Sequence, residues 1–176
     1  MKLRRYQQAA VDAVYDHLRH RNDNPVAVLP TGAGKSLVLA KIASDAVMRW
    51  GGRVLILAHE KELLEQNADK VRKLCPGIPV GLYSAGLKKR DTNTPILVAG
   101  IQSIYKRAPE LEPFDLIIVD ECHLLTRSGD GIYRGTCQHA SKAWDTKCPG
   151  SCRLLRERAT SRACNRVEVP TSVAER

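Results

Sequence analysis

The segment VAVLPTGAGKS, residues 26–36, joins a short apolar run to a glycine-rich turn that ends in lysine and serine. The apolar run is typical of a strand buried on both faces, and residues 37–49 are predicted to form a helix. Glycines let backbone N–H groups close around phosphate oxygens, and the N-terminus of the next helix favours negative charge. The segment therefore predicts a phosphate-binding loop between a strand and a helix.

The polar residues of this loop have distinct expected roles. Lys35 would reach the β- and γ-phosphates of a nucleotide, and the hydroxyl of Ser36 would ligate Mg²⁺. Leu29 stands where the general G-x-x-x-x-G-K-[ST] pattern has a glycine. The alternative is a glycine turn with an exposed lysine, but the flanking strand and helix favour the phosphate loop. The turn itself would be made by Thr31, Gly32, Ala33 and Gly34.

Strands and helices alternate along residues 1–135. Such alternation predicts an α/β fold, a parallel sheet with helices on both faces. Right-handed crossovers would place the loops that follow the strands along one edge, where ligands of such sheets bind. Residues 87–94 are expected to be a polar, basic loop. The predicted helices are 6–20, 37–49, 61–74 and 102–107, and the predicted strands are 26–29, 53–58, 80–83, 96–99 and 116–119.

The segment LIIVDECH, residues 116–123, places two carboxylates, a cysteine and a histidine at the end of a predicted strand. A zinc site or a Cys–His nucleophile is disfavoured because adjacent strand residues point to opposite faces, and no partner pair lies nearby at zinc-finger spacing. Two interpretations remain. In one, Asp120 holds Mg²⁺ and Glu121 orients the attacking water. In the other, the cluster is only the polar end of a buried strand.

Five segments resemble motifs of the superfamily-two DEAD/DEAH-type helicases, in the family's order. PTGAGKS resembles motif I and VDECH motif II, and the nearest group includes the helicase subunits of type III restriction enzymes. LRRYQQAAV resembles the N-terminal element whose glutamine, here Gln7, reads adenine. LILAHEKELLEQ resembles motif Ia and VAGIQSI motif Ib, which contact nucleic-acid backbone in the family. The resemblance covers about residues 1–135 and implies a P-loop NTPase, RecA-like fold.

The resemblance also implies ligands and roles. ATP and Mg²⁺ are the expected cofactors, Lys35, Asp120 and Glu121 the catalytic residues, and His123 the link to motif III. The expected partner is nucleic acid, DNA more than RNA. Relatives usually carry Ser or Thr where this chain has Gly100, which removes one hydroxyl contact. The nucleic-acid contacts would be His59, Glu60, Lys61, Gln66, Gln102 and Ser103, although the first four also suit an ordinary helix N-terminus.

Residues 136–176 differ in composition from the rest of the chain. They contain no Ile, Phe, Tyr or Met and four of the six cysteines. We therefore expect an ATP-binding domain over 1–135 that is incomplete at its C-terminal end, without motif III or the second RecA-like lobe. The tail has three interpretations: out-of-frame translation from near 133–136, a disordered basic tail, or a metal-binding appendage. The last would use Cys137, His139, Cys148 and Cys152.

Charge and hydropathy limit the remaining function classes. The net charge of +9 favours polyanionic partners. No apolar run approaches the ~18 residues of a membrane span, and the N-terminus lacks the apolar region of a secretory signal, so we expect a cytoplasmic protein. The resemblance to the helicase family implies a bacterial or phage type. The alternative to a helicase lobe is a non-catalytic fragment that binds nucleic acid or a partner and keeps a vestigial nucleotide site.

Overall fold

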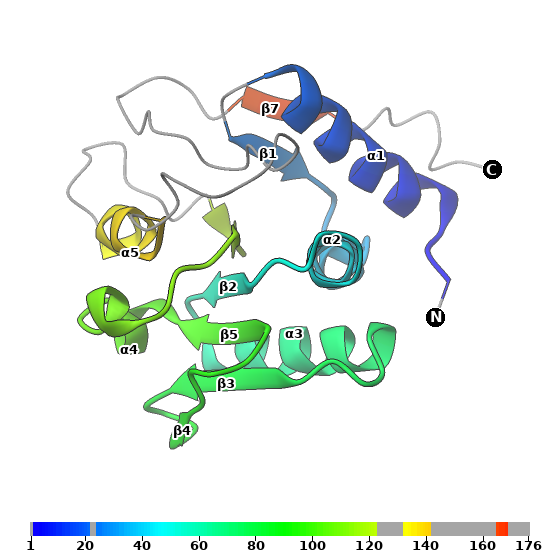
Figure 1. Cartoon of the computed structure of the whole chain (residues 1–176). Coiled ribbons are helices and arrows are strands. Elements are labelled where there is room, and N and C mark those ends of the chain that lie inside the picture. The colour runs from blue at the N-terminus through cyan, green and yellow to red at the C-terminus, as the bar shows by residue number, and fades with distance from the viewer. Residues whose placement is uncertain (1, 22–23, 123–131, 142–164, 169–176) are drawn as a thin grey trace.

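A five-stranded sheet forms the centre of the computed structural model, which describes residues 2–21, 24–122, 132–141 and 165–168. Its strand order is β4-β3-β5-β2-β6, and the strands are parallel except that β4 runs antiparallel to β3 (Figure 1). The predicted α/β fold is confirmed. The strands are β2 (Val54–Ala58), β3 (Val80–Ser84), β4 (Lys89–Arg90), β5 (Ile96–Gly100) and β6 (Leu116–Val119).

The helices cover both faces of this sheet. Each predicted helix is present, although the fourth is shorter than predicted, spanning four residues where 102–107 was expected. A short 3-10 helix, η1 (Ala108–Glu110), follows it. In the described residues, none of the helices is both long and apolar enough to span a bilayer. The helices are α1 (Arg5–His20), α2 (Lys35–Trp50), α3 (Lys61–Leu74), α4 (Ile101–Ile104) and α5 (Ile132–Ser141).

The apolar run of β2 explains why helices cover both faces. All five β2 side chains are fully buried, and neighbouring residues of a strand point to opposite faces. Val54, Ile56 and Ala58 belong to the cluster formed with α2 and α3. Leu55 and Leu57 belong to the opposite cluster, formed with α4 and α5. A continuous apolar strand of this kind is stable only between two covering layers.

The strand before the phosphate loop lies outside this sheet. β1 (Pro25–Val28) pairs in parallel with β7 (Asn165–Glu168) in a separate two-stranded sheet. The sequence predicts a single parallel sheet, but β1 lies outside it. Strand pairing depends on contacts between distant segments, which a local apolar pattern does not specify.

One further local expectation requires correction. Residues 87–94 are not only a loop, because Lys89 and Arg90 form β4. Asp91 extends this pairing, since its backbone N–H donates to the Leu82 carbonyl over 3.0 Å and its carboxylate accepts from the Leu82 N–H over 3.0 Å. In α5, Ala140 is buried against the sheet, and its carbonyl accepts from the Phe114 N–H.

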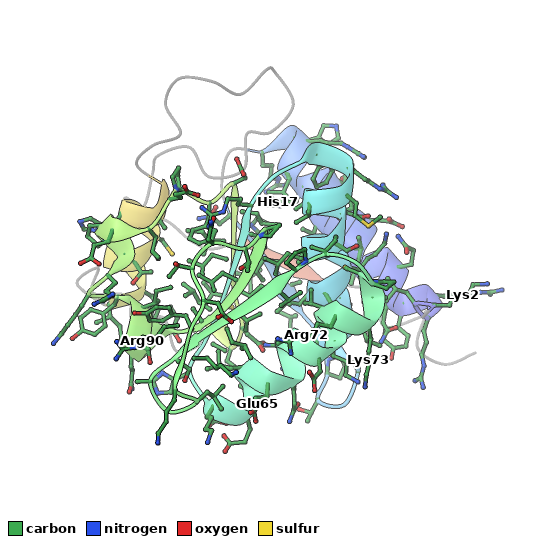
Figure 2. All side chains as sticks on the ribbon, turned by 60° about the horizontal axis from the view of Figure 1, so that its bottom comes forward. Lys2, His17, Glu65, Arg72, Lys73 and Arg90 are labelled. Atoms are coloured by element: carbon green, nitrogen blue, oxygen red, sulfur yellow. The ribbon has the colours of Figure 1, made fainter. Side chains whose placement is uncertain are left out.

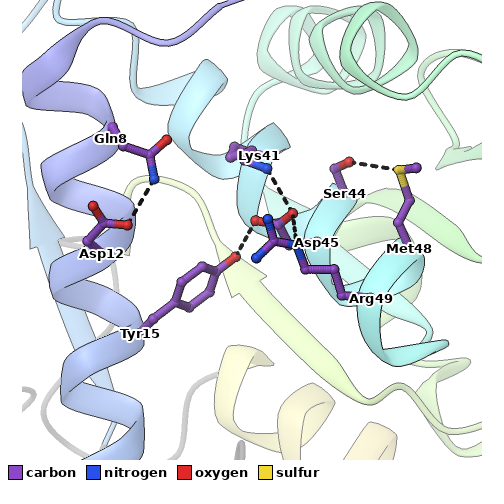
Figure 3. A network of polar contacts seen from close by, with 8 residues as sticks. All are labelled: Gln8, Asp12, Tyr15, Lys41, Ser44, Asp45, Met48 and Arg49. Atoms are coloured by element: carbon purple, nitrogen blue, oxygen red, sulfur yellow. Dashed lines mark hydrogen bonds and ion pairs between the residues drawn. The ribbon is translucent and has the colours of Figure 1, made fainter.

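A polar network holds α1 against α2 (Figure 3). The carboxylate of Asp45, which is 4% exposed, accepts from Tyr15 Oη over 2.9 Å and forms ion pairs with Lys41 at 2.8 Å and Arg49 at 3.1 Å. Burial, followed by this hydrogen bond, raises the pKa of Tyr15 above its ordinary value. Trp50 packs edge-on against the Tyr15 ring. The helix that follows the phosphate loop is thereby fastened to the N-terminal helix.

Candidate functional site

The phosphate loop has the backbone conformation that its glycines permit. Gly32 and Gly34 have φ of +78° and +74°, in the left-handed region that glycine enters at little cost. The Ala33 N–H donates to the Pro30 carbonyl over 3.2 Å, which closes the turn. α2 begins directly at Lys35, so the predicted strand–loop–helix arrangement is present and the loop lies at a helix N-terminus.

Gln7 lies against this loop from the side of α1. It is 3% exposed, and its Nε2 donates to the Ala33 carbonyl over 2.9 Å while its Oε1 accepts from the Arg4 N–H. Tyr6 Oη donates to the same Ala33 carbonyl over 3.0 Å. A Cβ added at Gly34 would lie 2.7 Å from Gln7 Nε2. The residue predicted to read adenine therefore also supports the loop, and a side chain at Gly34 would displace the Gln7 amide.

The acidic cluster, formed by Asp120 and Glu121, follows β6 and lies beside the phosphate loop. The Asp120 N–H continues the ladder by donating to the Leu57 carbonyl over 2.8 Å, and Asp120 Oδ1 accepts from the Glu121 N–H over 3.1 Å. Glu121 has a φ of +55°, uncommon for a residue other than glycine. Its Oε1 lies 3.5 Å from Lys35 Nζ. Two motifs 86 residues apart in sequence thus meet at one site.

Asn67 is a residue of this site that the sequence analysis did not identify. It is fully buried on α3, and its Nδ2 donates to Asp120 Oδ2 over 2.8 Å. Its Oδ1 is buried without a hydrogen-bond partner among the described residues. An asparagine on the apolar face of an amphipathic helix, between Leu64 and Val71, was the available signal. The contact orients the Asp120 carboxylate. It comes from α3, whose N-terminal residues belong to motif Ia.

The oxygen donors present suit magnesium. Mg²⁺ is usually bound by one or two carboxylates together with substrate phosphates and water. Asp120 supplies a carboxylate, and Ser36 supplies a hydroxyl in the first turn of α2. The part of the chain described here contains no cluster of three His, Cys, Asp or Glu side chains that could hold a metal alone. His123, Cys148 and Cys152, which the sequence analysis also considered, lie outside the described residues.

On α5, Tyr133 is buried in the core cluster that contains Leu55 and Leu57, and Cys137 is partly buried against the same cluster. Within the part of the chain that the structure describes, the Tyr133 hydroxyl is buried without a hydrogen-bond partner. Its pKa is raised first by burial and then by the charge of Asp120. Burial raises the pKa of the Cys137 thiol to about 11. A thiol with so high a pKa is protonated at neutral pH and is therefore a poor nucleophile.

A separate pocket of about 300 Å³ lies beside the N-termini of α3 and α4. Four of the six residues predicted to contact nucleic acid line it: His59, Lys61, Gln102 and Ser103. Glu60 and Gln66 are exposed on the same segment but are not part of the lining. The lining also contains residues that the sequence analysis did not select, among them Ser84 and Gly86. The structure thus brings motif Ia and motif Ib together with the end of β3.

A glycine loop at the start of a helix, facing an acidic strand end, defines a P-loop nucleotide-binding domain of the RecA-like type. Residues 1–145 match the model of the family described as "Type III restriction enzyme, res subunit". Because this match spans most of the chain, the chain belongs to that family. The predicted resemblance to superfamily-two helicases is confirmed.

Individual relatives agree with this assignment. The chain is 29% identical over 161 residues to "Putative ATP-dependent helicase IRC3" of Saccharomyces cerevisiae, covering 84% of this chain and 22% of the relative. It is 35% identical over 133 residues to "DNA 3'-5' translocase XPB2" of Sulfurisphaera tokodaii, covering 75% and 27%. The crystal structure of the UvsW helicase from bacteriophage T4 superposes with a TM-score of 0.61 at 24% identity, covering 80% of this chain and 50% of that one. The chain spans about a quarter of the length of the curated relatives.

Proposed function

We propose that this chain is the ATP-binding lobe of a nucleic-acid-dependent helicase or translocase. The observation that supports this most is the 3.5 Å approach of Lys35 Nζ to Glu121 Oε1, because it joins the phosphate loop and the acidic cluster at one site. Lys35 binds the β- and γ-phosphates, and Glu121 orients the attacking water. Gln7 reads adenine from its place against the loop.

The cofactor of this lobe is Mg·ATP, with Ser36 and Asp120 as the protein groups that hold the metal. When bound, Mg²⁺ neutralises charge on the phosphates. Asn67 keeps the Asp120 carboxylate oriented through the 2.8 Å hydrogen bond. The loop amides and the N-terminus of α2 favour the negative charge of the phosphates even without a metal ion.

The partner of this lobe is nucleic acid, DNA more than RNA. The pocket that joins His59, Lys61, Gln102 and Ser103 supports backbone binding, and the XPB2 relative is named as a DNA translocase. The relatives are about four times longer, which leaves room for a second RecA-like lobe. An arginine finger supplied in trans is worth ~10³–10⁵ in rate in related NTPases, so the isolated chain should bind ATP weakly and hydrolyse it negligibly.

The test is titration of residues 1–176 with a fluorescent ATP analogue and Mg²⁺. Lys35→Ala should weaken binding by about tenfold or more, because a charge-assisted contact to phosphate is lost. The matched control is Lys73→Ala, which removes an exposed lysine in the last turn of α3 and should leave nucleotide affinity unchanged.

Two outcomes would contradict the proposal in different ways. Strong DNA-stimulated ATP turnover by 1–176, abolished by Lys35→Ala, would show that the chain is a complete motor and not one lobe. Salt-sensitive nucleic-acid binding without measurable nucleotide binding, unchanged in Lys35→Ala and Glu121→Gln, would favour the non-catalytic binding fragment.

A further inference from the structure

Ser84, at the end of β3, is a largely buried residue whose side chain lines the pocket beside α3 and α4. The residue is only 5% exposed, yet it forms part of the pocket lining. Its hydroxyl has no hydrogen-bond partner among the described residues, in contrast to the hydroxyls of Ser44 and Thr136. Ser84 Oγ is not among the fully buried polar atoms that lack a partner, so the hydroxyl can be reached from the pocket and can donate to a ligand there.

Two glycines leave the Ser84 hydroxyl open to the pocket. A Cβ added at Gly86 would lie 3.8 Å from Ser84 Oγ, and one added at Gly100 would lie 3.9 Å from it. The hydroxyl therefore lies between two positions at which any other residue would place a side chain. Glycines at such positions allow the backbone of a ligand to approach closely.

The surroundings of Ser84 suit an anion. Lys61 lines the same pocket, and the β3–β4 hairpin carries the exposed basic residues Lys88, Lys89 and Arg90. Figure 2 shows Arg90 at this hairpin, apart from Arg72 and Lys73 on α3. The lining includes no Asp, Glu, Phe, Tyr or Trp. It thus offers hydrogen-bond donors and positive charge, which suit phosphate oxygens, and lacks the large aromatic rings on which nucleic-acid bases stack.

The turn that carries Ser84 is held in place before any ligand binds. Ser103 Oγ accepts from the Ala85 N–H over 3.0 Å, and the Lys88 N–H donates to the Ala85 carbonyl over 3.1 Å. Ser103, predicted as a direct nucleic-acid contact, therefore also positions this turn. A preformed turn avoids the ordering cost that a flexible loop would incur on binding.

We propose that the Ser84 hydroxyl donates a hydrogen bond to a backbone phosphate of a nucleic-acid strand bound over this pocket. It supplies there the hydroxyl that Gly100 lacks. The inference rests on the proposed nucleic-acid function and adds a binding residue to it. Ser84 is a neutral donor, so its contribution to affinity differs in kind from that of Lys61.

The first test measures binding of a labelled oligothymidylate of about 12 nucleotides to residues 1–176 by fluorescence anisotropy over a range of salt concentrations. Ser84→Ala should weaken binding by about tenfold without changing the slope of log affinity against log salt, because a hydroxyl releases no counterion. Lys61→Ala should reduce that slope by about one phosphate contact. Ser44→Ala, at a buried serine whose hydroxyl contacts Met48, should behave as the wild type.

The second test moves the hydroxyl. Gly100 has a φ of −74°, which any residue adopts, and a Cβ there would meet Leu64 Cδ1 at 3.3 Å, a contact that a small shift relieves. Ser84→Ala combined with Gly100→Ser should therefore recover most of the lost affinity. Without that recovery, the effect of Ser84→Ala would be structural and the inference overturned. Equal, salt-sensitive binding by wild type and Ser84→Ala would overturn the inference alone, whereas absence of binding by the wild type would overturn the proposed nucleic-acid function with it.

Discussion

The two strands that deliver the nucleotide site, β1 and β6, are supported in different ways. β6 pairs with β2 inside the five-stranded sheet, whose central strands are fully buried. Among the described strands, β1 pairs only with β7, and none of its residues is fully buried. The acidic half of the site is therefore supported by a sheet core and the phosphate-loop half by helices.

The helical support of the phosphate loop is small and largely polar. Its apolar cluster has four buried members, Ala10, Val11, Leu29 and Val38. The hydrogen bonds from Gln7 and Tyr6 to the Ala33 carbonyl, together with the Asp45 network, supply the remaining contacts. Hydrogen bonds contribute less net free energy than apolar burial of similar extent, so we expect the loop half to yield first under denaturant.

The largest predicted effect tests the two supports directly. Ile56→Ala, in the fully buried β2, should lower the free energy of unfolding by about 4 kcal/mol, because it removes a core side chain and leaves a cavity. Val26→Ala, in the partly exposed β1, should cost about 1 kcal/mol. Urea titrations followed by circular dichroism would measure both. Equal losses would show that β1 belongs to the same cooperative core.

Removing a buried polar group that supports the phosphate loop should lower the free energy of unfolding by an intermediate amount. Asp45→Ala removes the buried carboxylate that holds Tyr15, Lys41 and Arg49. We expect a loss of about 2 kcal/mol, below the range for fully buried pairs because Arg49 is 61% exposed. Asp69→Ala, which removes the exposed ion pair with Arg72, is the matched control and should change stability by less than about 0.5 kcal/mol. A similar loss of unfolding free energy in both variants would show that the Asp45 network stabilises the phosphate loop no more than an exposed ion pair does.

The difference between the halves also shows what could be predicted from sequence. The strand–loop–helix around Lys35, the amphipathic helix over 61–74 and the buried strand before Asp120 follow from local apolar patterns and turn residues. The separation of β1 from the main sheet does not follow from local patterns, because strand pairing depends on contacts between segments that are distant in sequence. Asn67 and Ser84 were missed for a related reason. Each is a single polar residue in an ordinary helix or strand, and its significance depends on what the fold places opposite it.

Asn67→Ala should show a smaller effect within the acidic half. The hydrogen bond from Asn67 Nδ2 to Asp120 Oδ2 is lost, but the partnerless Oδ1 is removed as well. The two terms partly offset each other, and we expect a loss of about 1 kcal/mol in unfolding free energy. Binding of the fluorescent ATP analogue with Mg²⁺ should weaken more than binding without the metal, because Asp120 loses a contact that orients it. Equal weakening in both conditions would show that Asn67 has a structural role only.

The smallest predicted effect is a loss of unfolding free energy at alkaline pH, caused by the Cys137 thiol on α5. Burial raises the pKa of Cys137 from 9.0 to about 11, so between these values the unfolded chain releases a proton that the folded chain retains. Stability from this group is complete below about pH 9 and falls as pH rises toward 11, by at most about 1.4 kcal/mol per pH unit. The stability advantage of the wild type over Cys137→Ala should therefore shrink by about 1 kcal/mol between pH 8 and pH 10, measured by urea titration at both values. Tyr15 titrates alike in both proteins and cancels from the difference, because Cys137 is not among the groups that shift its pKa. The charge of Cys137 is the smallest of the causes that raise the pKa of Tyr133, so the pH dependence of the difference comes mainly from the thiol. An advantage that does not change with pH would mean that water reaches the thiol.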